Sequence, residues 1–366
     1  MVRRRYVGTR TLQEGMVIDQ VIMDRTGRIL IAKKTVLDAF LIDAIRKMGV
    51  PGIYIREGEE EPEAPEEIVI APAVQETINK LKVADRAKVE LSESVRTRVG
   101  QGIQYIFSET SSPDFTNAAE NVTASLLDAI LESDAVALNI DALKVSDEYT
   151  FKHSVDVATI AMIIAKKGNM PDSDVRKIGV AGLLHDVGKS MIPNEVLNKA
   201  GKLTEEEFQI MKKHSLFGYN ILKEKKELPS EVILGVLHHH EKINGKGYPL
   251  RLTADQISPY AKIIAIADVY DALVTERPYK KAFSQQDALE MIMAMTEELD
   301  IDYMRNFIDS VILYPVDSVV MLSNGERAKV VKNAPHYPLR PKVVGIKSGK
   351  VYDLLEDMNC ASLTIE

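Results

Sequence analysis

Between about residues 115 and 310 the sequence carries one helical signal after another and no strand pattern. Thr204 followed by Glu207 is a capping box, in which the side chains and the backbone of a helix start satisfy one another. Pro259 after Ser258 suits a first helical turn. Consecutive helices bury their apolar faces by packing on each other, so this stretch predicts a mainly α fold built on a helical bundle.

Both ends of the chain have β-rich patterns instead. Residues 1–56 predict a small α+β module, because VIDQVIM, DRTG and RILI read as a β-hairpin, residues 37–47 have helical periodicity, and GIYI reads as a further strand. Residues 311–366 predict a small β module, in which Asn324-Gly325 is a strong hairpin signal between two β-rich runs.

Two segments connect the first module to the bundle. The linker, residues 57–72, includes EGEEEPEAPEE, whose seven glutamates repel one another and can bury little. Residues 73–114 are polar with a thin apolar stripe, which predicts a helical connector. That stripe is either a homodimer contact or the packing face of a helix on its own chain. The bundle itself is predicted to span residues 115–310.

Composition limits the classes of protein that remain. With 366 residues, 45% of them hydrophobic, the chain can build a large core, so disorder of the whole chain is excluded. The single Cys360 cannot form an internal disulfide, which fits a reducing compartment. The longest apolar run, 157–165, is about half of a bilayer span, and no apolar region follows the start MVRRRYV. We therefore expect a cytoplasmic protein without a membrane span.

The net charge of −8 argues against binding of DNA or RNA, because contact with the phosphate backbone needs a positive surface. It leaves room for a small phosphate-bearing ligand in a locally basic pocket. The positions of the histidines in the sequence are more informative than the net charge. Six of the seven histidines lie between residues 153 and 240, which is the first indication of metal chemistry.

The candidate metal ligands follow one another at intervals of 25 to 32 residues, about one helix plus its connection. They are His153, His185, Asp186, His214, His239, His240 and Asp268. Four of them, His153, His185, His214 and Asp268, lie on apolar helix faces in the predicted pattern, and we expect successive helices to supply one ligand each. Burying so many polar groups without a common partner would be costly, and a metal centre removes that cost.

Imidazole and carboxylate ligands suit iron, manganese, zinc or nickel better than calcium or magnesium. Seven side chains exceed the needs of one tetrahedral site, so we expect two divalent transition-metal ions. Asp186 is the natural bridge, because its two oxygens can reach both ions. Such a pair activates a shared hydroxide and stabilises the oxygens of an in-line displacement at phosphorus.

Three motifs carry a resemblance to a known family. HDVGK at 185–189, HHHEKINGKGYP at 238–249 and IADVYDALVTERPYKKAF at 266–283 strongly resemble the HD-GYP subfamily of the HD-domain phosphohydrolases, over about residues 130–310. The resemblance implies hydrolysis of cyclic di-GMP to the linear dinucleotide pGpG, and it leaves open a second step to GMP. It also favours iron as the metal, with manganese second.

The resemblance assigns the ligands in two groups. One metal would be held by His153, His185, Asp186 and Asp268. The other would be held by Asp186, His214, His239 and His240. Asp186, as the bridge, and Lys189, which offsets developing negative charge, are the implied catalytic residues.

The resemblance also implies the contacts to substrate. Lys189, Arg277 and Lys280 would bind the substrate phosphates, and Arg277 could do so bidentately. The loop Gly247-Tyr248-Pro249 would shape the wall of the site. Lys242 and Lys246 either draw in an anionic substrate or are ordinary surface lysines.

Two positions depart from the family pattern. Asn244-Gly245 stands where the family usually has Asp-Gly, so a hydrogen bond that orients Glu241 or a histidine would change. Tyr149 stands where some members have a glutamate that binds a third metal, which favours a two-metal site.

Four other residues have simpler interpretations. His238 is expected to be exposed or to lie behind the ligands, and His336 to be a solvated loop residue. Tyr270 is a core residue rather than a platform for guanine. Asp271 either orients a ligand or belongs to a local hydrogen-bond network.

Two alternatives to the hydrolase of cyclic di-GMP stay open. One is a receptor that binds the cyclic dinucleotide with little turnover and relays the signal through its terminal modules. The other is a hydrolase of a different cyclic dinucleotide, such as cyclic GMP-AMP, because the residues that read the base are not visible in the sequence.

Overall fold

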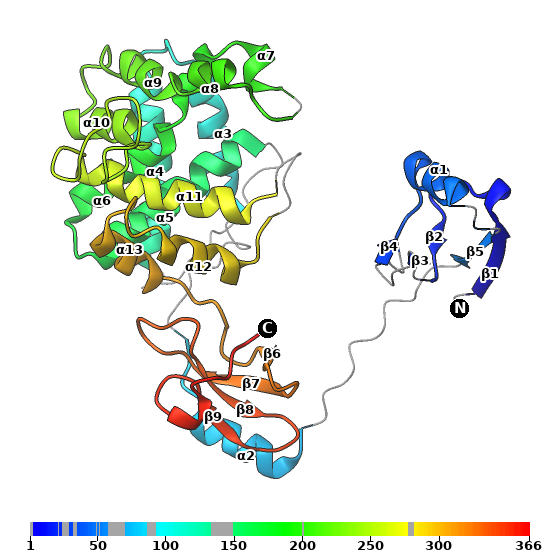
Figure 1. Ribbon diagram of the computed structural model, residues 1–366. Coiled ribbons are helices and arrows are strands. Elements are labelled where there is room, and N and C mark those ends of the chain that lie inside the picture. The colour runs from blue at the N-terminus through cyan, green and yellow to red at the C-terminus, as the bar shows by residue number, and fades with distance from the viewer. Residues whose placement is uncertain are drawn as a thin grey trace. The chain divides into compact units, whose positions relative to one another are not determined.

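The computed structural model describes the chain apart from residues 1–2, 21, 24–28, 32–34, 49, 51, 58–69, 86–92, 133–148, 200 and 277–281. The chain divides into two compact units, residues 1–69 and 70–366, each described here by itself (Figure 1). The predicted mainly α fold with small terminal modules is confirmed. Most of the predicted acidic linker lies outside the described residues.

The first unit is the predicted α+β module. A three-stranded antiparallel sheet has the order β1 (Arg3–Gly8), β5 (Gly52–Glu57), β2 (Val17–Ile18), and β3 (Ile22–Met23) pairs with β4 (Ile29–Ile31). The predicted hairpin is therefore confirmed, as is the helix, α1 (Ala39–Lys47). Asp38 caps α1 by accepting a hydrogen bond from the Leu41 N–H. Ile45 and Ile53 are fully buried in this unit's core.

The second unit contains the helical domain. Its helices are α3 (Glu93–Ser108), α4 (Phe115–Glu132), α5 (Tyr149–Lys167), α6 (Asp172–Leu184), the 3₁₀ helix η3 (Val187–Met191), α7 (Asn194–Leu197), α8 (Glu205–Met211), α9 (His214–Leu222), α10 (Ser230–His238), α11 (Pro259–Val274), α12 (Gln285–Ala294) and α13 (Ile301–Ile308). The capping box at Thr204 and Glu207 and the first-turn Pro259 are confirmed.

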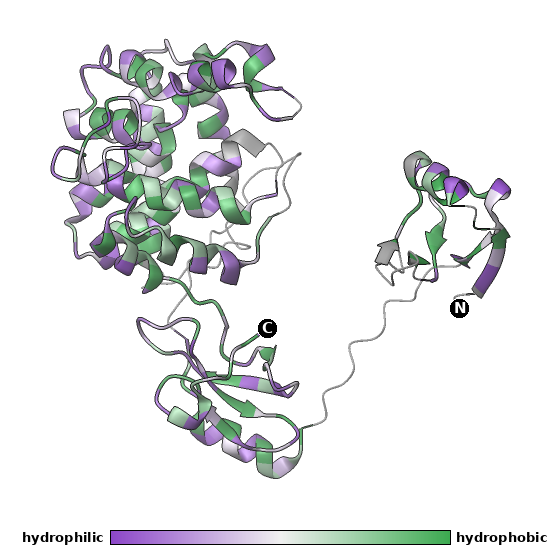
Figure 2. Cartoon of the chain, viewed as in Figure 1, coloured by the Kyte–Doolittle hydropathy of each residue, from purple (hydrophilic) through white to green (hydrophobic). Residues whose placement is uncertain are grey.

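The core of this domain forms around α5, α6 and α11, which pack against one another. Ile160, Ile178 and Ile264 are fully buried members of that core. Figure 2 shows hydrophobic and hydrophilic segments alternating along the helices, as expected of amphipathic helices that share a core. Burial of each such side chain contributes about 1.5–3 kcal/mol, which holds these helices in fixed positions around the site described below.

The tail of the chain forms an antiparallel sheet in the order β6 (Val319–Met321), β7 (Arg327–Lys332), β8 (Lys342–Gly345), β9 (Val351–Asp353), followed by the 3₁₀ helix η4 (Met358–Cys360). The predicted hairpin at Asn324-Gly325 joins β6 to β7, and Gly325 has the positive φ of +80° that the turn requires.

The predicted connector contains two helices with different partners. Ile78 of α2 (Pro72–Leu81) packs with Val331 and Val344 of the C-terminal sheet. The apolar side of α3, including Ile103 and Ile106, joins the core of the helical domain. The apolar stripe of this segment is therefore a packing face on its own chain. No helix in the described part of the chain is both long and apolar enough to span a bilayer.

Candidate metal centre

The predicted ligands come from five helical segments, but several lie at helix ends rather than on helix faces. His185 follows the last residue of α6, Asp186 precedes η3, and His239 follows α10. His185, which the sequence pattern places on an apolar helix face, thus stands at the end of that helix. The chain changes direction where a helix ends. Adjacent residues there, such as His185 and Asp186, can therefore both face one centre.

The remaining ligands approach from other elements. His153 lies within α5, His214 is the first residue of α9, and Asp268 lies within α11. His240 follows His239 in the loop after α10. All seven predicted ligands are thus brought to one place in the helical domain.

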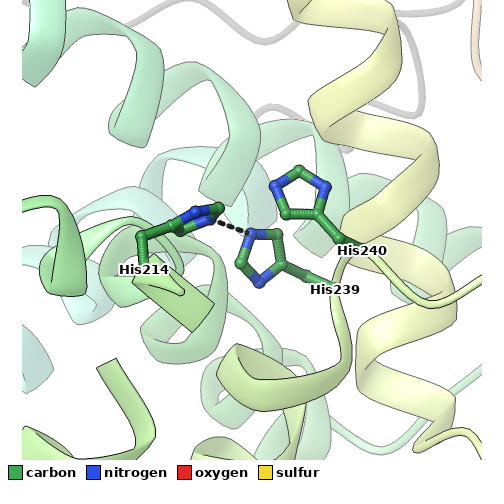
Figure 3. A group of neighbouring side chains, drawn as sticks. All are labelled: His214, His239 and His240. Carbon is green, nitrogen blue, oxygen red and sulfur yellow. Dashed lines mark hydrogen bonds between the residues drawn. The ribbon is translucent and has the colours of Figure 1, made fainter. Parts of the chain in front are cut away.

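Three groups of side chains have potential ligand atoms within 4.8 Å of one another. These groups are His214, His239 and His240; His153, His185 and Asp268; and His185, Asp186 and His239. Figure 3 shows the first group, in which the Nε2 atoms of His214 and His239 are 3.2 Å apart. The described residues therefore provide two histidine groups with a shared region between them.

Asp186 occupies that shared region. Its Oδ2 lies 3.3 Å from Nε2 of His185 and 3.6 Å from Nε2 of His153, while its Oδ1 lies 3.5 Å from Nε2 of His214. Within the described part of the chain, His185 Nε2 and Asp186 Oδ1 are buried atoms that form no hydrogen bond. Buried polar atoms in proteins almost always have a partner, so this donor set fits divalent metal ions.

The other nitrogen of each ligand ring is held by the protein. Nδ1–H of His185 donates to Gly182 O at 2.7 Å, Nδ1–H of His214 to Met211 O at 2.8 Å, and Nδ1–H of His239 to Val236 O at 2.7 Å. Each acceptor is the carbonyl three residues earlier in the chain. These bonds leave Nε2 of each ring directed at the centre, as is usual for histidine ligands of metals.

His153 is held by a carboxylate instead. Its Nδ1 lies 2.6 Å from Oδ2 of the fully buried Asp271, which also accepts a hydrogen bond from the Thr275 hydroxyl. The interpretation of Asp271 as a residue that orients a ligand is thus supported by direct contact.

Burial and neighbouring charges shift the pKa values of the side chains in the cluster. Burial lowers the pKa of His239 well below its usual range and that of His240 to about 3, so both rings are neutral and can act as ligands. Burial would also lower the pKa of His153, but hydrogen bonds and charge from Asp268 and Asp271 raise it to about 10. Burial opposes ionisation of Asp186, yet the charges of Lys189 and His185 hold its pKa well below the usual range.

Of the predicted phosphate-binding residues, one is described. Lys189 Nζ lies 2.5 Å from Asp186 Oδ2, and its side chain is one-third exposed, so it lies between the carboxylate and solvent. Arg277 and Lys280 fall outside the described residues. Tyr149 begins α5, but its side chain also lies outside them.

The loop after α10 is fixed by Glu241 and forms one wall of the site. The buried Glu241 carboxylate accepts hydrogen bonds from the backbone N–H groups of Leu250, Arg251 and Leu252. The Tyr248 ring lies against His240, with centroids 4.7 Å apart. Asn244 accepts a hydrogen bond from the Lys246 N–H within its own turn, whereas the Glu241 carboxylate is held by backbone N–H groups.

The simpler interpretations have mixed outcomes. His238 is buried and accepts a hydrogen bond from the Ser258 N–H at 3.4 Å, so exposure was the wrong alternative. His336 is a largely exposed loop residue, 2.6 Å from Asp309 Oδ2. Tyr270 is a core residue that packs on Phe307. Lys242 pairs with Glu298 at 2.6 Å.

The sequence reasoning missed one buried carboxyl group. Asp156 is 1% exposed, and within the described residues neither of its oxygens has a hydrogen-bond partner. Burial and the charge of Asp271 raise its pKa well above the usual range, which favours the protonated form. The available signal was its position three residues after His153, on the same helix face.

Replacing Asp271 with Asn is expected to weaken metal binding about 10- to 100-fold, because residues that orient a histidine ligand typically contribute that much. Asn keeps the shape of the side chain but not the charge that holds the His153 ring. Titration of metal against a competing chelator measures the change. Asp128→Asn, an exposed position on α4, is the control, and equal affinities of the two variants would contradict the assigned role.

Comparison with known proteins shows which proteins this chain resembles. A family model described as HD domain matches residues 137–303. A cyclic di-GMP phosphodiesterase of Pseudomonas aeruginosa is 32% identical over 318 residues, covering 83% of this chain and 77% of that protein. A cyclic di-GMP phosphodiesterase response regulator of Xanthomonas campestris is 41% identical, covering 38% of this chain and 37% of that protein. A 3′3′-cGAMP-specific phosphodiesterase of Vibrio cholerae is 38% identical, covering 42% of this chain and 30% of that protein.

The helical fold, with a His-Asp pair between two groups of histidines, defines an HD-domain protein whose cluster suits divalent metal ions. The loop Gly247-Tyr248-Pro249 beside that cluster narrows the class further. The chain belongs to the HD-GYP family.

Proposed function

We propose that this protein is a metal-dependent phosphodiesterase that hydrolyses cyclic di-GMP to the linear dinucleotide pGpG, with GMP as the product of a second step. The observation that carries the proposal is the position of Asp186, whose oxygens lie within 3.6 Å of nitrogens from both histidine groups. The names of the relatives in Pseudomonas and Xanthomonas support the choice of substrate.

We assign the two metal positions as the sequence predicts, with Asp186 shared between them. His153, His185 and Asp268 would complete one, and His214, His239 and His240 the other. Two bound ions would polarise the phosphodiester and lower the pKa of water at the site. Iron is the proposed metal and manganese the alternative, since both accept this mixture of imidazole and carboxylate ligands.

The protein's own groups bind and orient the substrate. Lys189 is placed to contact the scissile phosphate, because its ammonium group already lies beside Asp186 and is partly open to solvent. There it offsets the negative charge that develops on the phosphate oxygens. Arg277 and Lys280 are proposed as further phosphate contacts on the strength of the sequence motif alone.

A second candidate substrate is 3′3′-cGAMP, which the Vibrio cholerae relative's name specifies. It differs from cyclic di-GMP in one base, whereas the metal cluster engages the phosphodiester that both share. A receptor that binds the dinucleotide with little turnover is the remaining alternative.

The test is to incubate iron- or manganese-loaded protein with cyclic di-GMP and to resolve the products. Linear pGpG is expected, and a parallel reaction with 3′3′-cGAMP gives the ratio of kcat/KM values. Absence of a linear product with every metal tested would overturn the proposal. Tight binding with unchanged ligand would favour the receptor.

The proposal also includes the location of the protein in the cell and its binding partners. We place the protein in the cytoplasm, where cyclic dinucleotides act as signals, and expect no binding to DNA or RNA because the net charge is −8. Homodimerisation through residues 73–114 stays a prediction. Since Ile78 and Ile103 are buried within the chain, such a contact would use the exposed sides of these helices.

A further inference from the structure

A basic pocket is lined in part by Tyr248, whose ring also lies against His240 of the metal-ligand cluster. It has a volume of about 690 Å³ and is formed by the end of α8, the start of α9 and the loop after α10. Its described lining residues are Phe208, Gln209, Lys212, Lys213, Leu216, Lys242, Gly245, Lys246, Gly247, Tyr248, Pro249 and Arg251. The volume falls in the range of small-molecule sites, about 300–1,000 Å³.

The lining of the basic pocket carries charge of one sign. Four lysines and one arginine line it, and none of the described lining residues is acidic. Lys242 is engaged by Glu298, whereas Lys213, Lys246 and Arg251 are exposed at the surface. In a chain with a net charge of −8, this concentration of positive charge in a hollow favours an anionic ligand.

The basic pocket and the metal-ligand cluster share a wall. The Tyr248 ring lies 4.7 Å from the His240 ring and 6.3 Å from the His214 ring, measured between centroids. Lys212 Nζ lies 5.8 Å from the centroid of the same tyrosine ring. The basic pocket and the cluster are therefore neighbours, with Tyr248 common to both.

The basic pocket also offers an aromatic surface. Phe208 is 41% exposed, although it is a large apolar side chain, and Lys212 Nζ lies 4.4 Å above its ring. Nucleobases stack on exposed aromatic rings, and neighbouring cations hold the phosphates that the bases carry.

We propose that the basic pocket binds the part of the cyclic dinucleotide that is not being hydrolysed, with its second phosphate on Lys213 and Lys246. This inference rests on the proposed function and extends it to a second subsite. Both phosphates of a cyclic dinucleotide belong to one small ring, so a substrate whose first phosphate lies at Asp186 must place its second phosphate nearby. The basic pocket supplies the positive charge for it, and Phe208 a surface for the attached base.

The test is the double substitution Lys213→Gln and Lys246→Gln, which removes one exposed charge from each side of the basic pocket. The KM for cyclic di-GMP is expected to rise about tenfold or more, because the loss of even one charge-assisted hydrogen bond costs about that factor. The kcat should change little. The matched control is Lys226→Gln, an exposed lysine that does not line the basic pocket.

Two further measurements separate this inference from the proposed function. Bis(p-nitrophenyl) phosphate has a single phosphate, so the double substitution should lower the ratio of kcat/KM for cyclic di-GMP over this compound about tenfold. Calorimetric titration of metal-free protein with cyclic di-GMP should show the same loss of affinity without turnover. A metal-loaded wild type that binds but does not cleave would overturn the function, whereas equal Kd values for wild type and double variant would overturn the subsite.

Discussion

Replacing Asp186 with Asn is expected to lower kcat for cyclic di-GMP about a thousandfold or more, the largest effect on activity that we predict. Asn has the shape of Asp but only one oxygen and no charge. It therefore cannot serve the two histidine groups on either side, whose nitrogens lie 3.3 to 3.6 Å from the carboxylate oxygens. Metal content per chain should fall in the same samples, and elemental analysis beside a product assay measures both.

The control for this substitution is Asp172→Asn. Asp172 lies at the opposite end of α6 from His185 and is exposed, so it tests the loss of an acidic charge on the helix that precedes Asp186. It should retain activity and metal. A fully metal-loaded and active Asp186→Asn protein would remove the basis of the shared position.

Replacing Gly188 with Ala is expected to destabilise the helical domain by about 3 kcal/mol or more, the largest effect on stability that we predict. A Cβ at this position would lie 2.0 Å from the carbonyl oxygen of His214 and 2.3 Å from the backbone nitrogen of Gly218. Both contacts are to the backbone of α9, so no side-chain rotation relieves them. The melting temperature should fall by about 6–12 °C, which differential scanning calorimetry would detect.

Gly235→Ala is the matched control. A Cβ there would meet only side-chain atoms, the nearest being Ala181 Cβ at 3.1 Å, and alanine favours the helix by about 1 kcal/mol over glycine. Its melting temperature should stay close to that of the wild type. Equal stability of the two variants would show that α9 can move away from Gly188. That movement would carry His214 with it, so metal affinity should then fall.

Much of the architecture follows from local signals in the sequence. The capping box at Thr204, the first-turn Pro259 and the Asn324-Gly325 hairpin depend on neighbouring residues, and all three are confirmed. The spacing of the histidines identified side chains that the fold brings together, because each interval matches one helix and its connection.

Other features depend on contacts between distant residues. The exact ends of α6 and α10 place His185 and His239 beyond the helix faces, and helix ends are set by packing as much as by local sequence. The burial of His238 depends on Ser258 in a later segment. The basic pocket joins Lys213 to Lys246 across two loops, whereas in the sequence each resembles an ordinary surface lysine.

The hydrogen bonds from the rings of His185, His214 and His239 to carbonyls three residues earlier have a consequence for metal supply. Each ring is aligned by its own helical turn, so the backbone itself contributes to the arrangement of the cluster. We therefore expect metal binding without a folding step, unlike in small zinc domains that fold only with their metal. Divalent ions would then exchange in the folded protein, and availability among metals with similar ligand preferences would decide the occupant. A change in metal supply would in that case alter signal turnover without new protein synthesis.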